Sequence, residues 1–209
     1  MIWFRIEKEK SVAPKHGKHY WDWKEYLSKE GKEQCVYCTI NIKSFGGIRN
    51  FHVEHYKPKA EDKFPELIND ILNLYFSCSI CNTFKGDQWP NDPSVALDNK
   101  SFPDPSKIDY SDFLKWNDKF LIESNKVTGK YLIQQLFLNR PQLILERKSY
   151  FLHNNLKQEC EKLLTILNLL KSRKKGDKIL DGYINSVKTN ILLLQDKYLN
   201  PYTTKQIKR

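Results

Sequence analysis

The sequence predicts an α+β protein, in which a small zinc-stapled unit of strands and a short helix precedes a mainly α-helical C-terminal region. Three observations support this prediction. Two C-x2-C pairs lie in the first half of the chain, an alternating apolar and polar segment lies between them, and apolar patterns with a helical period fill much of the second half. A loop with four prolines between residues 87 and 107 separates the two parts, so we expect domains over residues 1–102 and 103–209.

The first expected elements flank the first cysteine pair. Residues 19–30 form an amphipathic stretch with two tryptophans, and Gly31 is placed to end a helix there. Two consecutive glycines within residues 45–49 indicate a turn. The sequence therefore predicts a helix and a turn ahead of the strands.

Two strands and a short helix are expected next. Residues 51–56 alternate in the manner of a strand until Pro58 ends the pattern. Residues 68–76 are an apolar run that leads into the second cysteine pair, and residues 82–87 resemble the first turns of a short helix. The expected order is strand, strand, helix.

The second half of the chain predicts a helical hairpin. Apolar residues recur with a spacing of about 3.6 residues over 150–170 and again over 179–194. The basic segment 172–177 joins these stretches. Two antiparallel helices with a basic tip are therefore expected.

The net charge of +10 is unevenly distributed along the chain. Residues 1–100 carry 15 Lys and Arg against 14 Asp and Glu, whereas residues 101–209 carry 20 against 11, so +9 of the +10 lies in the second half. A basic surface attracts polyanions such as nucleic acid, but a lysine-rich composition also serves solubility, and both interpretations stay open. No stretch has the roughly 18 to 20 apolar residues of a membrane span, and no export signal is visible. We expect a cytoplasmic protein.

Four of the five cysteines have the spacing of a zinc site. The pairs Cys35/Cys38 and Cys78/Cys81 are each C-x2-C and are separated by 39 residues. Two such pairs place four thiolates around one ion and leave no position open for water, which is typical of structural Zn²⁺. Buried or redox-active cysteines without a bound metal are the alternative. Cys160 stands alone on an expected helix and is predicted to lie in the core.

Polar side chains stand between and beside the two pairs. His52, Glu54 and His55 share one expected strand. Asn73 lies within the apolar run 68–76, and Asn82 directly follows the last cysteine. Each has an ordinary structural interpretation, such as a solvated carboxylate, a turn former or a helix cap. Neighbouring strand residues also face opposite sides, so Glu54 and His55 can meet in one site only if the strand twists or bends.

The joint order of these residues resembles the HNH endonuclease signature in its zinc-stapled form. The resemblance rests on Cys35-x2-Cys38, Val53-Glu54-His55-Tyr56-x-Pro58, Asn73-Leu74 and Cys78-x2-Cys81-Asn82-x2-Lys85-Gly86. It implies a ββα-metal unit in which His55 is the general base, Glu54 and Asn82 hold a catalytic Mg²⁺ or Mn²⁺, and Asn73 fixes the loop that orients His55. The family often has Asp in place of Glu54, and His52 has no fixed role in it.

These residue types suit the hydrolysis of a phosphodiester. An anionic phosphate needs a cation to neutralise it and a base to activate water, and a neutral imidazole can supply the base near pH 7. Three lysines are placed to meet flanking phosphates of a DNA or RNA substrate, namely Lys57, Lys59 and Lys85.

A narrower resemblance covers more of the chain. It rests on Gln34-Cys35-Val36-Tyr37-Cys38, His52-Val53-Glu54-His55-Tyr56-x-Pro58-Lys59 and Leu136-x-Leu138-Asn139-Arg140-Pro141. These segments are similar to the HNH subunit of Septu-type anti-phage defence systems, which some retrons also carry. The resemblance implies an ATPase subunit that gates the nuclease, with residues 103–209 as its docking surface or as a nucleic-acid-binding region.

Two other functions fit parts of the pattern. In a zinc-dependent nucleobase deaminase, His52 with Cys78 and Cys81 would hold a catalytic zinc, although Ser77 stands where such enzymes have proline and Cys35 and Cys38 would have no role. In a non-catalytic, zinc-stapled nucleic-acid-binding module, the polar residues of the strand would have no chemical role.

Overall fold

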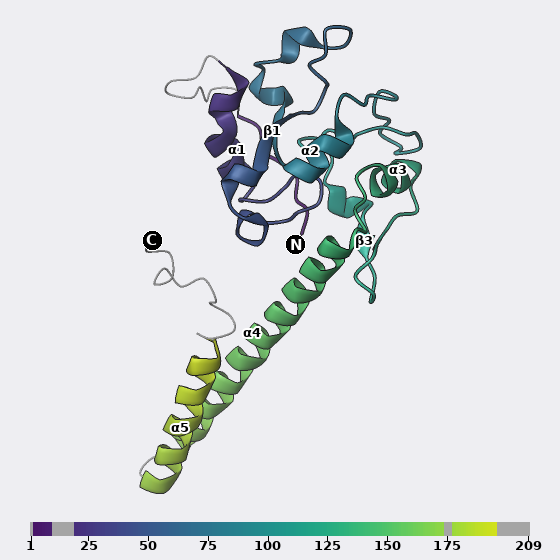
Figure 1. The fold of residues 1–209 in the computed structure, drawn as a ribbon. Helices are drawn as coiled ribbons and strands as arrows, with labels where there is room; N and C mark the ends of the chain where they lie inside the picture. Colours follow the sequence, from purple (N-terminus) through teal and green to yellow (C-terminus); the bar gives the residue numbers. More distant parts are fainter. Residues whose placement is uncertain (1, 10–18, 174–176, 196–209) are drawn as a thin grey trace. The chain divides into compact units, whose positions relative to one another are not determined.

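A computed structural model describes residues 2–9, 19–173 and 177–195 (Figure 1). It divides the chain into two compact units, Met1–Arg147 and Lys148–Arg209. This division differs from the expected boundary at 102/103, because residues 103–147 pack against the preceding part of the chain. No helix among the described residues is both long and apolar enough to cross a membrane.

Two antiparallel strands and a helix form the centre of the first unit. Strand β1 (Phe51–His55) pairs with β2 (Leu74–Cys78), with Glu54 opposite Tyr75 in the register. Helix α2 (Ser79–Lys85) follows β2 without a loop. All five residues of β2 are buried, which explains why its sequence is an apolar run rather than an alternating one.

An N-terminal helical segment covers this centre. A 3-10 helix (Tyr20–Trp23) continues into α1 (Lys24–Glu30), which ends at Gly31 as expected. Trp23 and Leu27 are buried, so the amphipathic pattern of this stretch does mark its inner face. Two further 3-10 helices, Ile42–Phe45 and Ile48–Asn50, flank the expected turn, where Gly46 adopts a φ of +73° that favours glycine.

The following segment completes the first unit. It contains the short antiparallel strands β3 (Lys115–Trp116) and β4 (Ile122–Glu123), helix α3 (Val127–Gln135) and the start of α4. Strands β3 and β4 were not predicted, because residues 103–209 were expected to be mainly helical. Hydrogen bonds tie this segment to the earlier chain: Ile6 N to Pro105 O at 2.9 Å, Tyr75 Oη to Asp104 at 2.6 Å, and Gln135 Nε2 to Phe84 O at 2.8 Å.

The second unit is a helical hairpin, as the apolar periods predict. Helix α4 (Pro141–Arg173) begins in the first unit, and α5 (Lys178–Leu194) lies beside its distal part (Figure 1). Asp177 caps α5 by accepting from the amides of Ile179 and Leu180. Cys160 is buried in this unit, so the prediction of a core cysteine is confirmed. The middle of the expected basic tip, residues 174–176, lies outside the described residues.

Candidate active site

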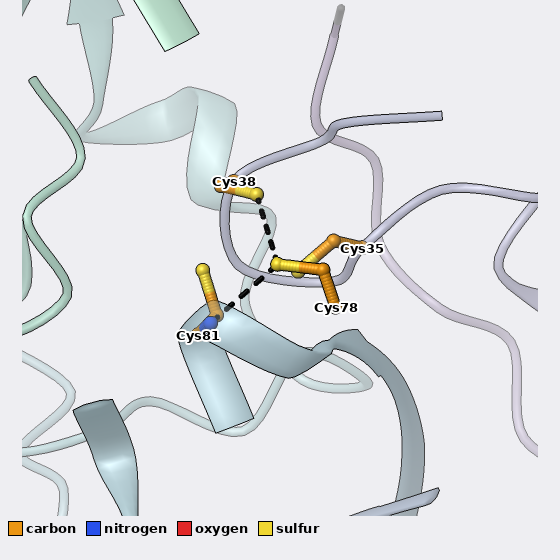
Figure 2. Close-up of side chains that lie close together, drawn as sticks. All are labelled: Cys35, Cys38, Cys78 and Cys81. Atoms are coloured by element: carbon orange, nitrogen blue, oxygen red, sulfur yellow. Dashed lines mark hydrogen bonds between the residues drawn. The ribbon is translucent and has the colours of Figure 1, made fainter. Parts of the chain in front are cut away.

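The four paired cysteines converge in the first unit. Cys35 and Cys38 lie in the turn after α1, Cys78 ends β2, and Cys81 lies in α2 (Figure 2). All four are buried, and their sulfur atoms lie within 4.8 Å of one another, with Cys38 and Cys78 3.7 Å apart. Tetrahedral Zn²⁺ with Zn–S bonds of about 2.3 Å requires sulfurs about 3.8 Å apart. The cluster therefore fits a zinc ion and leaves no position for substrate.

Arg140 lies against this cluster from the loop between α3 and α4. Its guanidinium donates to the sulfurs of Cys38, Cys78 and Cys81 at 3.6 to 3.9 Å. Burial alone would lower the pKa of Arg140, but the neighbouring cysteine thiolates raise it. A Zn²⁺ ion with four thiolates carries two negative charges, so a guanidinium at this distance offsets part of that charge.

Removing this guanidinium is expected to loosen the zinc without unfolding the protein. For Arg140→Met, we expect zinc affinity to fall about 10- to 100-fold, as is usual when a group that hydrogen-bonds to a metal ligand is lost. Competition with a chromogenic chelator measures the affinity. Arg49→Met is the matched control, because Arg49 is exposed and donates instead to the Gly46 carbonyl. Equal zinc affinity in Arg140→Met and Arg49→Met would contradict this prediction.

A cavity of about 370 Å³ brings together three of the four candidate catalytic residues, namely Glu54, His55 and Asn82, and His52 lines it as well. Asn73 is not among the residues that line this cavity. The rest of its wall includes Tyr20, Trp21, Lys24, Phe51, Val53, Pro58, Lys59, Gly86 and Asp87. Glu54 and His55 are neighbours on β1, and both are among the residues that line this cavity.

Glu54 is held by two donors on its inner side. Its Oε1 accepts from Lys85 Nζ at 2.7 Å and from Tyr37 Oη at 3.2 Å. Glu54 is also among the residues that line the cavity, although only 4% of its side chain is exposed. Burial raises the pKa of Glu54, and the Lys85 ammonium opposes this rise. A cation bound to this carboxylate would favour its ionised form further.

Lys85 does not have the position expected of a phosphate-binding residue. Its side chain is fully buried and bonds to the Glu54 carboxylate and, at 2.8 Å, to the backbone carbonyl of His55. The expectation that Lys85 meets a flanking phosphate is therefore corrected: a buried ammonium needs its charge paired inside the protein, and Glu54 supplies the pair. Lys85 joins two candidate catalytic residues instead.

The imidazole of His55 has a defined orientation. Its Nε2 lies 2.9 Å from the Ile68 carbonyl, and the ring packs edge-on against Tyr20 with centroids 4.7 Å apart. A carbonyl oxygen only accepts hydrogen bonds, so Nε2 carries the proton and Nδ1 is the nitrogen that can take one. Burial lowers the pKa of His55, and this favours the neutral ring.

Asn73 closes the loop that follows β1. Its Oδ1 accepts from the Lys57 amide at 2.8 Å, and its Nδ2 donates to the carbonyls of Lys57 at 3.0 Å and Leu67 at 3.3 Å. Tyr56 also donates to the Asn73 carbonyl at 2.9 Å. These bonds fix the chain one and two residues after His55.

The remaining candidate residues lie at the edge of the site. Asn82 is half-buried on α2, and its side-chain amide makes no hydrogen bond within the part of the chain that the structure describes. Lys59 lines the cavity and donates to Tyr20 Oη at 2.8 Å, whereas Lys57 lies over the Phe64 ring and outside the cavity. His52 is exposed on the cavity wall.

The cysteine geometry does not favour a deaminase. The metal centre of a deaminase would contain His52 together with Cys78 and Cys81. Among the described residues, the group of side chains that could bind a metal ion consists of the four cysteines. Cys35 and Cys38 complete that cluster, and His52 is not part of it.

Comparison with known proteins agrees with this geometry. Residues 35–88, about a quarter of the chain, match the family model described as HNH endonuclease. Searches of curated proteins and of solved structures give no significant match. The matched segment contains the four cysteines and all the candidate catalytic residues. These findings support an HNH nuclease domain, and with it a metal-dependent nuclease that acts on nucleic acid.

Proposed function

We propose that the cavity at the end of β1 is the active site of an HNH endonuclease that hydrolyses phosphodiester bonds in DNA or RNA. The observation that carries this proposal is the convergence of His55, Glu54 and Asn82 on one cavity beside a four-cysteine cluster. The order of β1, β2 and α2 supports a ββα-metal unit around these residues.

Each residue has a distinct role in the proposed reaction. The carboxylate of Glu54 and the amide oxygen of Asn82 would hold Mg²⁺ or Mn²⁺, since these ions prefer oxygen ligands of this kind. When bound, such a cation neutralises the phosphate and the departing oxygen. His55 Nδ1 takes a proton from a water whose oxygen then bonds to phosphorus, while the bond to the 3′ oxygen breaks and that oxygen takes up a proton from solvent. The products carry 5′-phosphate and 3′-hydroxyl ends.

Other residues position these groups. Lys85 binds the Glu54 carboxylate and the His55 carbonyl, so it sets the spacing of ligand and base. Asn73 holds the chain just beyond His55. Lys59 lines the cavity and is suited to a flanking phosphate, whereas Lys57 lies further away. The four cysteines brace the scaffold through zinc, and take no part in the chemistry.

We further propose that this nuclease is the effector of an ATPase-gated anti-phage system. An ungated nuclease would be hazardous to its host, so a regulating partner is plausible on physical grounds. The helical hairpin supports a docking role, because α4 and α5 expose many apolar side chains. The outer face of a helical bundle without a partner is usually polar. The exposed apolar side chains include Leu156, Leu163, Ile166, Leu170, Tyr183, Val187 and Leu193.

Metal dependence tests the proposed activity. The complete protein, with any subunit that co-purifies from its native operon, is incubated with plasmid, single-stranded DNA and structured RNA in Mg²⁺, Mn²⁺ or EDTA. We expect cleavage with Mg²⁺ or Mn²⁺ only, and Asn82→Ala is expected to need at least tenfold more metal for half-maximal rate, because one ligand is lost.

Asn125→Ala is the matched control, since Asn125 is an exposed asparagine outside the cavity. Cleavage that persists in EDTA, or identical metal titrations for Asn82→Ala and Asn125→Ala, would refute the assignment. If the isolated nuclease cleaves as fast as the complete assembly, the proposal of a gating partner is refuted, but the nuclease assignment stands.

A further inference from the structure

An exposed tryptophan stands at the wall of the cavity. Trp21 is 55% exposed, whereas Trp3 and Trp23 are buried and Trp89 and Trp116 are partly covered. Trp21 lines the same cavity as His55 and Asn82. A single exposed ring is common on protein surfaces, but this ring lines the cavity that holds the proposed base, so it is accessible to a ligand bound there.

The chain around Trp21 is anchored to the site. The Tyr20 amide donates to Asn69 Oδ1 at 2.8 Å, its hydroxyl accepts from Lys59 at 2.8 Å, and its ring packs against His55. On the other side, Trp23 is buried in the core. Trp21 is therefore presented from a fixed 3-10 turn, and its distance from the proposed base is set by Tyr20.

The indole is already part of an aromatic stack. His19 lies against Trp21 with ring centroids 4.4 Å apart and planes 18° from parallel, and Tyr20 meets it edge-on at 5.0 Å. More than half of the Trp21 side chain stays open beside these contacts. Lys24 and Lys59 line the cavity next to it. Flat aromatic surface combined with ammonium groups is the composition of single-stranded nucleic-acid sites, where bases stack and phosphates pair with cations.

We propose that Trp21, with His19 behind it, is a stacking platform for an unpaired nucleobase next to the scissile phosphate. This inference rests on the proposed nuclease function and narrows its substrate class. Inside a duplex both faces of a base are covered by its neighbours, so a protein ring can stack only on a base that is single-stranded, bulged, terminal or flipped out. The preferred substrate is therefore single-stranded nucleic acid, or a loop or bulge in a folded one.

Binding in a non-cleaving background tests the platform separately from catalysis. The complete His55→Ala protein, with any co-purifying subunit, is titrated with a labelled single strand, a duplex of the same sequence and a duplex with a one-base bulge. Trp21→Ala added to this background is expected to weaken binding of the single strand and the bulged duplex about tenfold or more, and to leave the intact duplex unchanged. Trp21→Phe should restore most of the lost affinity. Phe137→Ala, at a 58% exposed aromatic residue outside the cavity, is the matched control.

Fluorescence provides a second readout. The single strand should quench tryptophan emission in the His55→Ala protein, and most of this quenching should disappear with Trp21→Phe. Equal losses for single strand and duplex, or no difference between Trp21→Ala and Phe137→Ala, would overturn the platform but leave the nuclease assignment in place. Failure of the His55→Ala protein to bind any of the three nucleic acids would overturn both.

Discussion

Replacing Cys35 with serine is expected to release the zinc and unfold the first unit. The four sulfurs come from two segments, the turn after α1 and the junction of β2 with α2, and a zinc ion bound to all four would cross-link these segments. Zinc binding to four-ligand sites contributes about 10–16 kcal/mol in small zinc-dependent domains, which exceeds the net stability of most domains. Without the ion, several buried thiol groups would also face one another and Arg140 would lose its counter-charges.

Zinc stoichiometry by elemental analysis and circular dichroism on heating measure this effect. We expect one zinc per wild-type chain, less than a tenth of that in Cys35→Ser, and the loss of the cooperative thermal transition of the first unit. Cys160→Ser is the matched control, because Cys160 is equally buried but lies in the helical hairpin. A folded Cys35→Ser protein without zinc would show that the cysteine cluster does not brace this scaffold.

Replacing His55 with alanine is expected to lower the cleavage rate by about 10²- to 10⁴-fold, the usual contribution of a positioned general base. The Ile68 carbonyl fixes the ring and leaves Nδ1 as the proton acceptor. Alanine removes that acceptor but keeps the backbone carbonyl that Lys85 binds, so the Glu54 to Lys85 pair should survive. Zinc content and the thermal transition should therefore stay close to those of the wild type.

Single-turnover cleavage at saturating metal measures the chemical step. His153→Ala on α4 is the matched control, because it removes an imidazole from outside the cavity. A His55→Ala protein that cuts as fast as His153→Ala would show that another group activates the water.

The elements and the zinc cluster followed from local patterns. Paired cysteines, the alternation of residues 51–56 and the glycines after residue 45 each depend on neighbouring residues, so the sequence alone indicated them. The ordered series of polar residues likewise included three residues that line one cavity, Glu54, His55 and Asn82, whereas Asn73 lies outside it.

Long-range electrostatics could not be predicted in the same way. In the sequence, Lys85 looks like any surface lysine at the end of a helix, and only the fold places Glu54 within 2.7 Å of it. Arg140 and Cys38, which are in contact, lie 102 positions apart in the chain. In the sequence, Arg140 was noticeable only as part of the short motif that ends at Pro141. The expected boundary at 102/103 rested on a proline-rich loop, and such a loop indicates irregular backbone but not the absence of packing.

The packing of residues 103–147 on the earlier segments has a consequence for biosynthesis. Residues 35–88 hold every cysteine of the cluster and the proposed base, yet Asp104, Gln135 and Arg140 provide bonds that this segment lacks when it first emerges from the ribosome. Folding of the first unit is then completed only after α3 and the start of α4 have been translated. A nascent chain that stalled before that point would carry the proposed catalytic residues without the finished scaffold that aligns them.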